Sequence, residues 1–102
     1  MKLWVDDVRP APNGYRWAKS VHEAIIHICQ MKRPNGTYNV EVIDLDHDAG
    51  DYAFMGGDYI KLLDWMESKD INNIPIHLHT MNPVGRDNMR AIIKKNGWRE
   101  IR

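Results

Sequence analysis

The sequence predicts a single α/β domain over residues 1–102, built on a doubly wound and mainly parallel sheet of five strands. Three observations lead to this fold class. A chain of 102 residues is long enough for one hydrophobic core and too short for two. Short apolar runs alternate with segments of helical periodicity, and strands connected in this way pair in parallel. Acidic residues and histidines directly follow three of the apolar runs, where a parallel sheet forms its ligand sites.

The first half of the chain is expected to contain one helix and three strands, at residues 2–5, 15–18 and 38–45. Prolines and an Asn-Gly pair make residues 8–14 a loop in place of a first helix. Ser20 and Glu23 form a capping box, so a helix begins there and is expected to run to about Met31. Helical spacing puts Cys29 on the buried face of this helix. As the one cysteine, it excludes an intramolecular disulfide.

The second half is expected to contain two helices and two strands, the strands at residues 74–79 and 98–101. Asp58 is expected to cap the helix that follows the glycine-bearing loop 48–57. Asn82 before Pro83 predicts the start of the last helix, because asparagine caps helices and proline suits their first position. That helix ends at Asn96-Gly97.

Composition limits the class of function. The 14 basic and 14 acidic residues cancel, which argues against binding of long duplex nucleic acid through its phosphates. Acids at positions 6 and 7 oppose a signal peptide, and no run approaches the roughly 18 apolar residues of a membrane span. We therefore expect a cytoplasmic protein that has no membrane partner and binds a small ligand.

Asp6, Asp7 and Asp46 are the candidate metal ligands, because all three follow expected strands at one edge of the sheet. Two carboxylates about 4 Å apart repel by roughly 1 kcal/mol in water and roughly 4 kcal/mol near a protein surface. A cation, a shared proton or an arginine must offset this repulsion. Carboxylate oxygens suit Mg²⁺ or Mn²⁺, which we expect as the cofactor. The alternative is a solvated acidic rim whose acids cap loops.

His47, His79 and Asp48 are the candidate catalytic residues. Imidazole changes charge near neutral pH, so either histidine suits general acid or general base chemistry, and the sequence leaves open which does which. Strand alternation puts His77 on the same side as His79. The alternative is that these histidines serve packing or face solvent.

Thr80, Asn82, Arg86 and Arg9 are the candidate phosphate-binding residues. A hydroxyl, backbone N–H groups at the start of a helix and forked arginine cations all bind phosphate. The alternative is plain helix capping by Asn82, with the arginines in solvent.

The acid pair Asp6-Asp7, the central Asp46 and Thr80, each after a strand, resemble the response-regulator receiver domain. In that family the acids bind a divalent metal, the central Asp accepts a phosphoryl group and the Ser/Thr senses it. The resemblance implies the flavodoxin-like strand order 2-1-3-4-5. The chain differs in lacking the first and last helices and the Lys-Pro that follows the last strand of a receiver.

Residues 4–10, 45–50, 57–59 and 77–86 resemble more closely a receiver-like group, the cyclic-phosphate-processing receiver domains. This resemblance implies a metal-assisted phosphoesterase of phage or bacterial type. Its expected partner is a small cyclic nucleotide or an RNA end that carries a cyclic phosphate. Two alternatives remain open. One is a signalling module with Asp46 as phosphoacceptor, and the other is a non-catalytic binder of a cyclic nucleotide.

Overall fold

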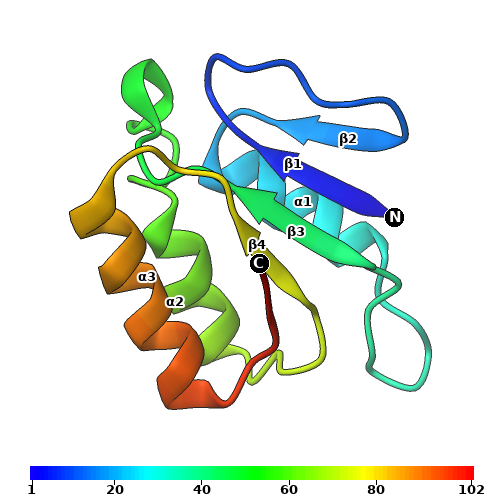
Figure 1. Cartoon of the computed structure of the whole chain (residues 1–102). Helices are drawn as coiled ribbons and strands as arrows, with labels where there is room; N and C mark the ends of the chain where they lie inside the picture. The colour runs from blue at the N-terminus through cyan, green and yellow to red at the C-terminus, as the bar shows by residue number, and fades with distance from the viewer.

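Five short strands form one parallel sheet in the computed structural model, which describes residues 1–102 (Figure 1). The strand order is β2-β1-β3-β4-β5, so the predicted fold class and order are confirmed. The elements are β1 (Lys2–Val5), β2 (Tyr15–Ala18), α1 (Val21–Gln30), β3 (Val42–Leu45), the 3₁₀ turn η1 (Gly50–Tyr52), α2 (Ile60–Ser68), β4 (Ile76–Leu78), α3 (Pro83–Asn96) and β5 (Glu100–Ile101).

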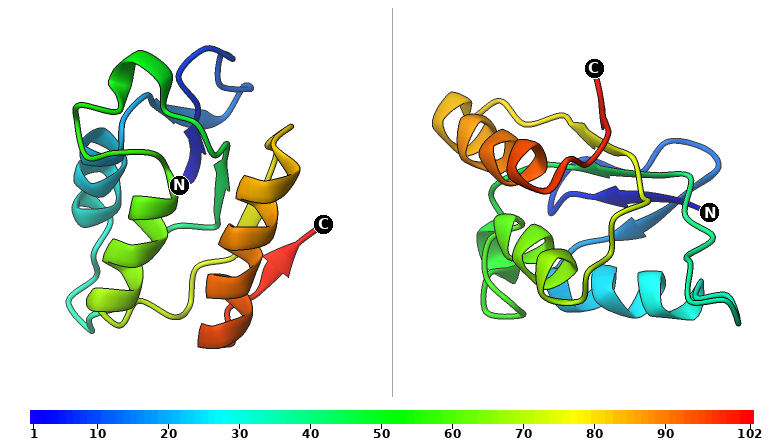
Figure 2. Two further views of the ribbon diagram at one scale, coloured as in Figure 1. Left: turned by 90° about the vertical axis from the view of Figure 1, so that its left-hand side faces the viewer. Right: turned by 90° about the horizontal axis from the view of Figure 1, so that it is seen from below.

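The three α-helices lie on one face of the sheet. Their connections run from β2 to β3, from β3 to β4 and from β4 to β5, all in the same direction across the sheet. Because such crossovers are right-handed, the helices must share a face. α1 contacts α2, and α2 contacts α3, as the row of helices in Figure 2 shows. β1 connects to β2 without a helix, so the opposite face of the sheet carries none.

The hydrophobic core fills the space between the sheet and these helices. Alternate strand residues point into it, in rows that cross the sheet: Leu3, Ile43 and Ile76 in one, and Val5, Leu45 and Leu78 in the next. Each such aliphatic side chain contributes about 1.5–3 kcal/mol when fully buried. None of the helices that close this core combines the length and apolar character needed to cross a bilayer.

The face of the sheet without helices carries a different set of side chains. Trp4 pairs in register with Trp17 on one side and Asp44 on the other, and Asp44 pairs with His77. This face therefore presents aromatic, acidic and imidazole groups where a covering helix would require aliphatic ones. We call it the open face.

The predicted strand at residues 38–45 is too long. β3 begins at Val42, and Tyr38 instead forms an isolated antiparallel bridge with Lys32. The N–H of Asn39 donates to the carbonyl of Met31, so the backbone of this segment pairs with the end of α1 and not with the sheet. The last two strands are also shorter than expected, at Ile76–Leu78 and Glu100–Ile101.

Two local predictions are wrong. Asp58 does not cap α2, because its Oδ1 accepts a hydrogen bond from the N–H of Ala49 and Tyr59 takes the N-cap position. Cys29 is exposed and not in the core. It follows the buried Ile28, and one residue rotates the side chain by about 100° around a helix, which turns Cys29 away from the sheet.

The cap of α1 gives a stability prediction. The Oγ of the buried Ser20 accepts from the N–H of Glu23, as the sequence predicts. We expect Ser20→Ala to lower the free energy of unfolding by about 1 kcal/mol, and Ser20→Gly to cost only a few tenths. Urea unfolding of both variants measures this. Equal losses would show that the hydroxyl matters for packing and not for capping.

Candidate functional site

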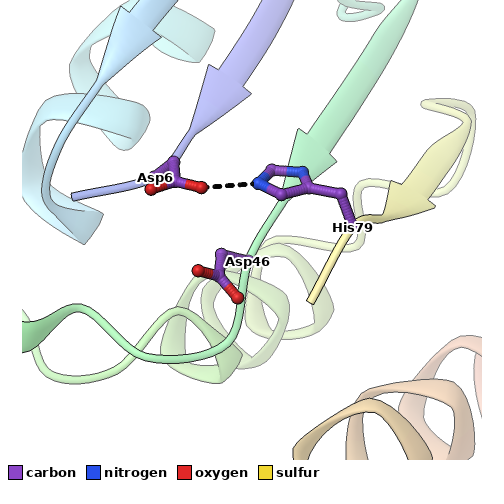
Figure 3. A group of neighbouring side chains, drawn as sticks. All are labelled: Asp6, Asp46 and His79. Atoms are coloured by element: carbon purple, nitrogen blue, oxygen red, sulfur yellow. Dashed lines mark hydrogen bonds and ion pairs between the residues drawn. The ribbon is translucent and has the colours of Figure 1, made fainter. Parts of the chain in front are cut away.

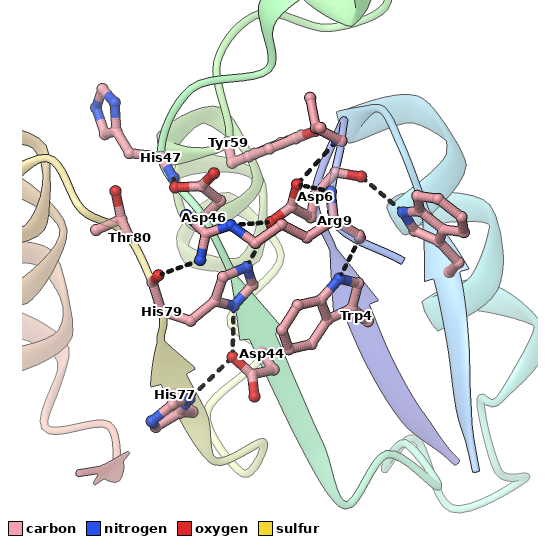
Figure 4. A network of polar contacts seen from close by, with 12 residues as sticks. Trp4, Asp6, Arg9, Asp44, Asp46, His47, Tyr59, His77, His79 and Thr80 are labelled. Carbon is pink, nitrogen blue, oxygen red and sulfur yellow. Dashed lines mark hydrogen bonds and ion pairs between the residues drawn. The ribbon is translucent and has the colours of Figure 1, made fainter. Parts of the chain in front are cut away.

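His79 lies at the centre of the polar groups at the carboxyl edge of the sheet (Figure 4). Its Nδ1 is 2.6 Å from Oδ1 of Asp44, and its Nε2 is 2.8 Å from Oδ2 of Asp6. The ring of Trp4 stacks on the imidazole, with the centroids 3.9 Å apart and the planes at 3°. Both ring nitrogens and one ring face are therefore held, which fixes the orientation of His79. We call the Asp44–His79–Asp6 arrangement the carboxylate clamp.

Asp6 is almost fully buried, with 1% of its surface exposed. Its Oδ1 accepts hydrogen bonds from the N–H groups of Val8 and Arg9 at 2.9 and 2.8 Å, which form the turn after β1. Burial by itself raises the pKa of Asp6, but these two N–H groups and His79 outweigh it, so the pKa lies below its ordinary value. Asp6 is therefore a carboxylate at neutral pH.

Asp44 lies inside β3, where a carboxylate needs compensation because water is largely excluded. Its Oδ1 contacts both His79 and Nδ1 of His77, the latter at 2.9 Å. Burial raises the pKa of Asp44, but the hydrogen bonds with the two histidines lower it overall. For His79 the balance is reversed. Burial lowers its pKa, but Asp44 and Asp6 raise it overall, which favours the imidazolium form.

Asp44 is the site residue that the sequence analysis did not select. A signal for it exists in the chain, because Asp44 interrupts an apolar run two residues before Asp46. In a strand, residues two apart share a face. His77 and His79 have the same spacing in the neighbouring strand, so pairing of β3 with β4 brings the acids and imidazoles together.

Asp6, Asp46 and His79 form the group that could hold a metal ion (Figure 3). Each offers one ligand atom, and these atoms lie within 4.8 Å of one another. Two carboxylates and an imidazole form a donor set that suits a divalent metal, with the nitrogen favouring a transition metal over Mg²⁺. Metal-bound histidines usually donate their other ring N–H to a carboxylate, and Asp44 occupies that position here. Metal binding would displace the proton from Nε2 of His79, and with that proton released the residues present fit the expected ion.

Asp7, the third acid expected at the metal, is not part of this group. Its Oδ2 faces Gly50 so closely that a Cβ there would overlap it, and Gly50 has a φ of +54°. Burial raises the pKa of Asp7, and the charges of Asp6 and Asp46 raise it further. Asp7 therefore faces Gly50 of η1 and lies outside the group that could hold a metal ion.

A hollow of about 350 Å³ opens beside the metal-capable group. It is lined by Arg9, Asp46, Asp48, Thr80, Met81 and Asn82. All of these except Met81 are predicted site residues, and Arg9 reaches the hollow from the first loop. Oγ1 of Thr80 accepts from the N–H of Asn82, and Oδ1 of Asn82 caps α3 through the N–H of Gly85. The hydroxyl proton of Thr80 and the amide N–H groups of Asn82 remain for a ligand. Arg86 does not line this hollow, which we call the edge hollow.

His47 lies apart from His79, on the other side of Asp46 (Figure 4). Its Nδ1 is 2.9 Å from Oδ1 of Asp48, and its backbone N–H donates to Oδ1 of Asp46. The ring packs against Gly85 in the first turn of α3, where any Cβ would overlap it. His47 therefore reaches the edge hollow through Asp48.

A family model described as the cyclic-phosphate processing Receiver domain matches residues 1–95. No curated protein and no solved structure matches the chain.

The clamp predicts how the protein responds to pH. The raised pKa of His79 means that its contribution to stability is complete below the ordinary value of 6.5 and is lost as the pH rises through the higher folded value. The lowered pKa values of Asp6 and Asp44 mean that theirs is complete above 3.8 and is lost as the pH falls through the folded values. The clamp therefore contributes most between these two limits.

NMR titration of the metal-free protein should place the pKa of His79 above 6.5, and Asp44→Asn should lower it. His22→Gln, a change of an exposed histidine on α1, is the control and should leave the His79 titration unchanged. A His79 that titrates at or below 6.5 would contradict the clamp as described.

Substitutions at Asp46 and Asp7 should differ in their effect on metal binding. We expect Asp46→Asn to weaken Mn²⁺ binding by tenfold or more, because it removes a donor of the group, and Asp44→Asn to weaken it about 10- to 100-fold through His79. Asp7→Asn should change it by much less. Electron paramagnetic resonance of free Mn²⁺ measures all three. If Asp7→Asn weakened Mn²⁺ binding as much as Asp46→Asn, both acids of the pair Asp6-Asp7 would bind the metal, as in receivers.

Proposed function

The chain belongs to the family of cyclic-phosphate processing receiver domains, and from this premise we propose that it hydrolyses cyclic phosphodiesters at the carboxyl edge of its sheet. One observation carries the proposal. The metal-capable group of Asp6, Asp46 and His79 borders a hollow that is supplied with donors for phosphate. A cyclic phosphodiester needs charge neutralisation at its oxygens, an activated water and a proton for the leaving hydroxyl.

Arg9, Thr80 and Asn82 hold the phosphate in this proposal. Arg9 is positioned by an Nη1 contact of 3.4 Å with the carbonyl of His79, and its Nε is 3.8 Å from Oδ2 of Asp6. Its remaining N–H groups, the hydroxyl of Thr80 and the amide of Asn82 supply donors from three directions. Arg86 stays outside the edge hollow, so we assign it no direct contact.

Asp6, Asp46 and His79 would hold a divalent ion such as Mn²⁺ or Mg²⁺. When bound, the ion would act as a Lewis acid on a phosphate oxygen and lower the pKa of a water ligand. The other groups of the clamp act on the protein side. Asp44 fixes the tautomer of His79 and Trp4 fixes the plane of its ring. With the Nδ1–H held by Asp44, Nε2 of neutral His79 would be the atom that binds the ion, so we assign His79 to holding the ion and leave proton transfer to another pair.

The His47–Asp48 pair carries the proton in this proposal. Water adds its oxygen to phosphorus and gives a proton to the pair, while the bond from phosphorus to one ring oxygen breaks. The pair then returns the proton to that oxygen, which leaves as a hydroxyl. The product is a phosphate monoester, so atoms and charge balance with one water consumed. Asp48 lines the edge hollow, and His47 holds it in place.

A second candidate is a signalling module in which Asp46 accepts a phosphoryl group. The supporting observation is that Asp46 follows β3, as in a receiver, and its half-buried carboxylate lines the edge hollow. Arg9 is the cation of that lining, so it would have to stabilise the phosphoryl group.

The test is product analysis with a panel of 2′,3′-cyclic nucleotides and cyclic dinucleotides, each with Mn²⁺, Mg²⁺ or EDTA. We expect metal-dependent conversion to phosphate monoesters that is lost in Asp46→Asn and reduced about 100-fold in His47→Gln, the usual contribution of a general acid–base group. Asp51→Asn, an exposed acid of η1 outside the edge hollow, is the matched control.

No turnover by folded protein would contradict the proposal. Stable labelling of Asp46 by acetyl phosphate would then support the signalling module. Tight binding with intact ligand recovered would instead support a non-catalytic binder.

A further inference from the structure

A second hollow, of about 440 Å³, lies on the open face of the sheet. We call it the face hollow. Its walls combine the ring of Tyr15 with the aliphatic side chains of Val42 and Ile101, and Lys2 and Glu41 add charged groups. Asp44 and His77 complete the lining. A concave site with apolar walls and a few convergent polar groups is typical of small-molecule binding.

The polar groups of the face hollow argue against a helix as its occupant. Asp44 is buried and paired, and His77 uses Nδ1 for Asp44, which leaves Nε2 for a ligand. An apolar helix laid over His77 would remove that nitrogen from water without giving it a partner. A ligand with its own donors and acceptors satisfies this surface at lower cost.

Asp44 connects the face hollow to the edge hollow. Asp44 lines the first and Asp46 lines the second, and they are two residues apart on one strand, or about 7 Å at 3.3 Å per residue. His79 connects the two linings, because its Nδ1 contacts Asp44 of the face hollow and its carbonyl accepts from Arg9 of the edge hollow. A nucleotide, in which a ribose joins a base to its phosphate, is long enough to reach from one hollow to the other.

We propose that the face hollow binds the nucleobase of the nucleotide whose cyclic phosphate occupies the edge hollow; this rests on the proposed function. Tyr15 is fixed by an edge-to-face contact with Trp4 at 6.2 Å and by Lys2, whose Nζ is 5.6 Å from the ring centroid. A held aromatic ring is a stacking surface for a base, and Glu41 and His77 can hydrogen-bond to base edges. The mixed charges of the hollow suit a base and not a phosphate chain.

The ligand class that follows is a nucleoside cyclic phosphate, free or at an RNA end, and not a cyclic phosphate without a base. The test uses the four ribonucleosides as probes, because they lack phosphate and need neither metal nor turnover. We expect at least one to shift the amide signals of Tyr15, His77 and Ile101 in NMR spectra of the whole chain. Ile101→Trp, which fills the hollow, should weaken that binding by at least tenfold, the scale of one lost base–aromatic stack.

Ile26→Trp is the matched control, because it introduces the same residue at an exposed position on α1, in the helix layer. It should leave nucleoside binding unchanged. Tyr15→Leu, which removes the stacking ring but keeps an apolar side chain, should also weaken binding at least tenfold. It tests the proposal independently if tryptophan disturbs β5.

Turnover assays separate this inference from the proposed function. With uridine 2′,3′-cyclic phosphate and with a trinucleotide that carries the same end, Ile101→Trp should raise KM at least tenfold. A raised KM with both substrates would show that the face hollow binds the base of a free nucleotide and the base of an RNA end equally. Nucleoside binding in the face hollow without turnover would overturn the phosphoesterase and support the base site. Turnover with no nucleoside shift and an unchanged KM in Ile101→Trp would overturn the base site alone.

Discussion

The contact of His79 with two buried carboxylates is the interaction on which the rest of the molecule depends. It joins Asp6 after β1, Asp44 within β3 and His79 after β4, so one imidazole connects three strands. These strands are only three or four residues long and contribute few backbone hydrogen bonds. Removing one partner of a buried ion pair leaves the other uncompensated, at a cost of about 3–5 kcal/mol. The clamp therefore belongs to the fold as much as to the site.

The clamp also explains how a sheet with helices on one face remains stable. A domain of this size buries only about two-thirds of its unfolded surface, so an uncovered sheet face removes a substantial share of the stabilising buried area. Trp4 partly offsets it by packing between His79 and Tyr15 and by donating its indole N–H to the carbonyl of Arg9. The loop that replaces the first helix is thereby tied to the face that such a helix would cover. What remains uncovered is the polar part of the face, which suits a ligand better than an apolar partner.

Local signals in the sequence predicted much of this fold. The bounds of β1 and β2 agree with the apolar runs, and the caps Ser20 and Asn82 act as their side chains predict. These features depend on neighbouring residues alone. The strand order came from the resemblance to receivers and not from periodicity. Tyr38 and Asp58 were assigned wrongly because their partners lie across a turn or a loop: Tyr38 bridges Lys32, and Asp58 accepts a hydrogen bond from the N–H of Ala49.

The site was only partly predictable for a related reason. Strand ends gave Asp46, Thr80 and the other edge residues, because parallel strands end together. The partner of His79 required knowledge of which strand pairs with β3, and the direction of Asp7 depends on how closely Gly50 approaches it. The packing of His47 on Gly85 likewise follows from the position of α3, which no local pattern encodes.

The residues of the clamp and those of the two hollows differ in how freely they can change during evolution. Asp6, Asp44 and His79 are bound to one another, so a substitution at any of them alters folding and chemistry together, and selection holds all three at once. Met81 and Ile101 have no such ties, because Met81 is exposed in a loop and Ile101 lies half-buried on a two-residue edge strand. The residues that line the two hollows can therefore diverge among descendants of this chain while the geometry of the clamp is inherited unchanged.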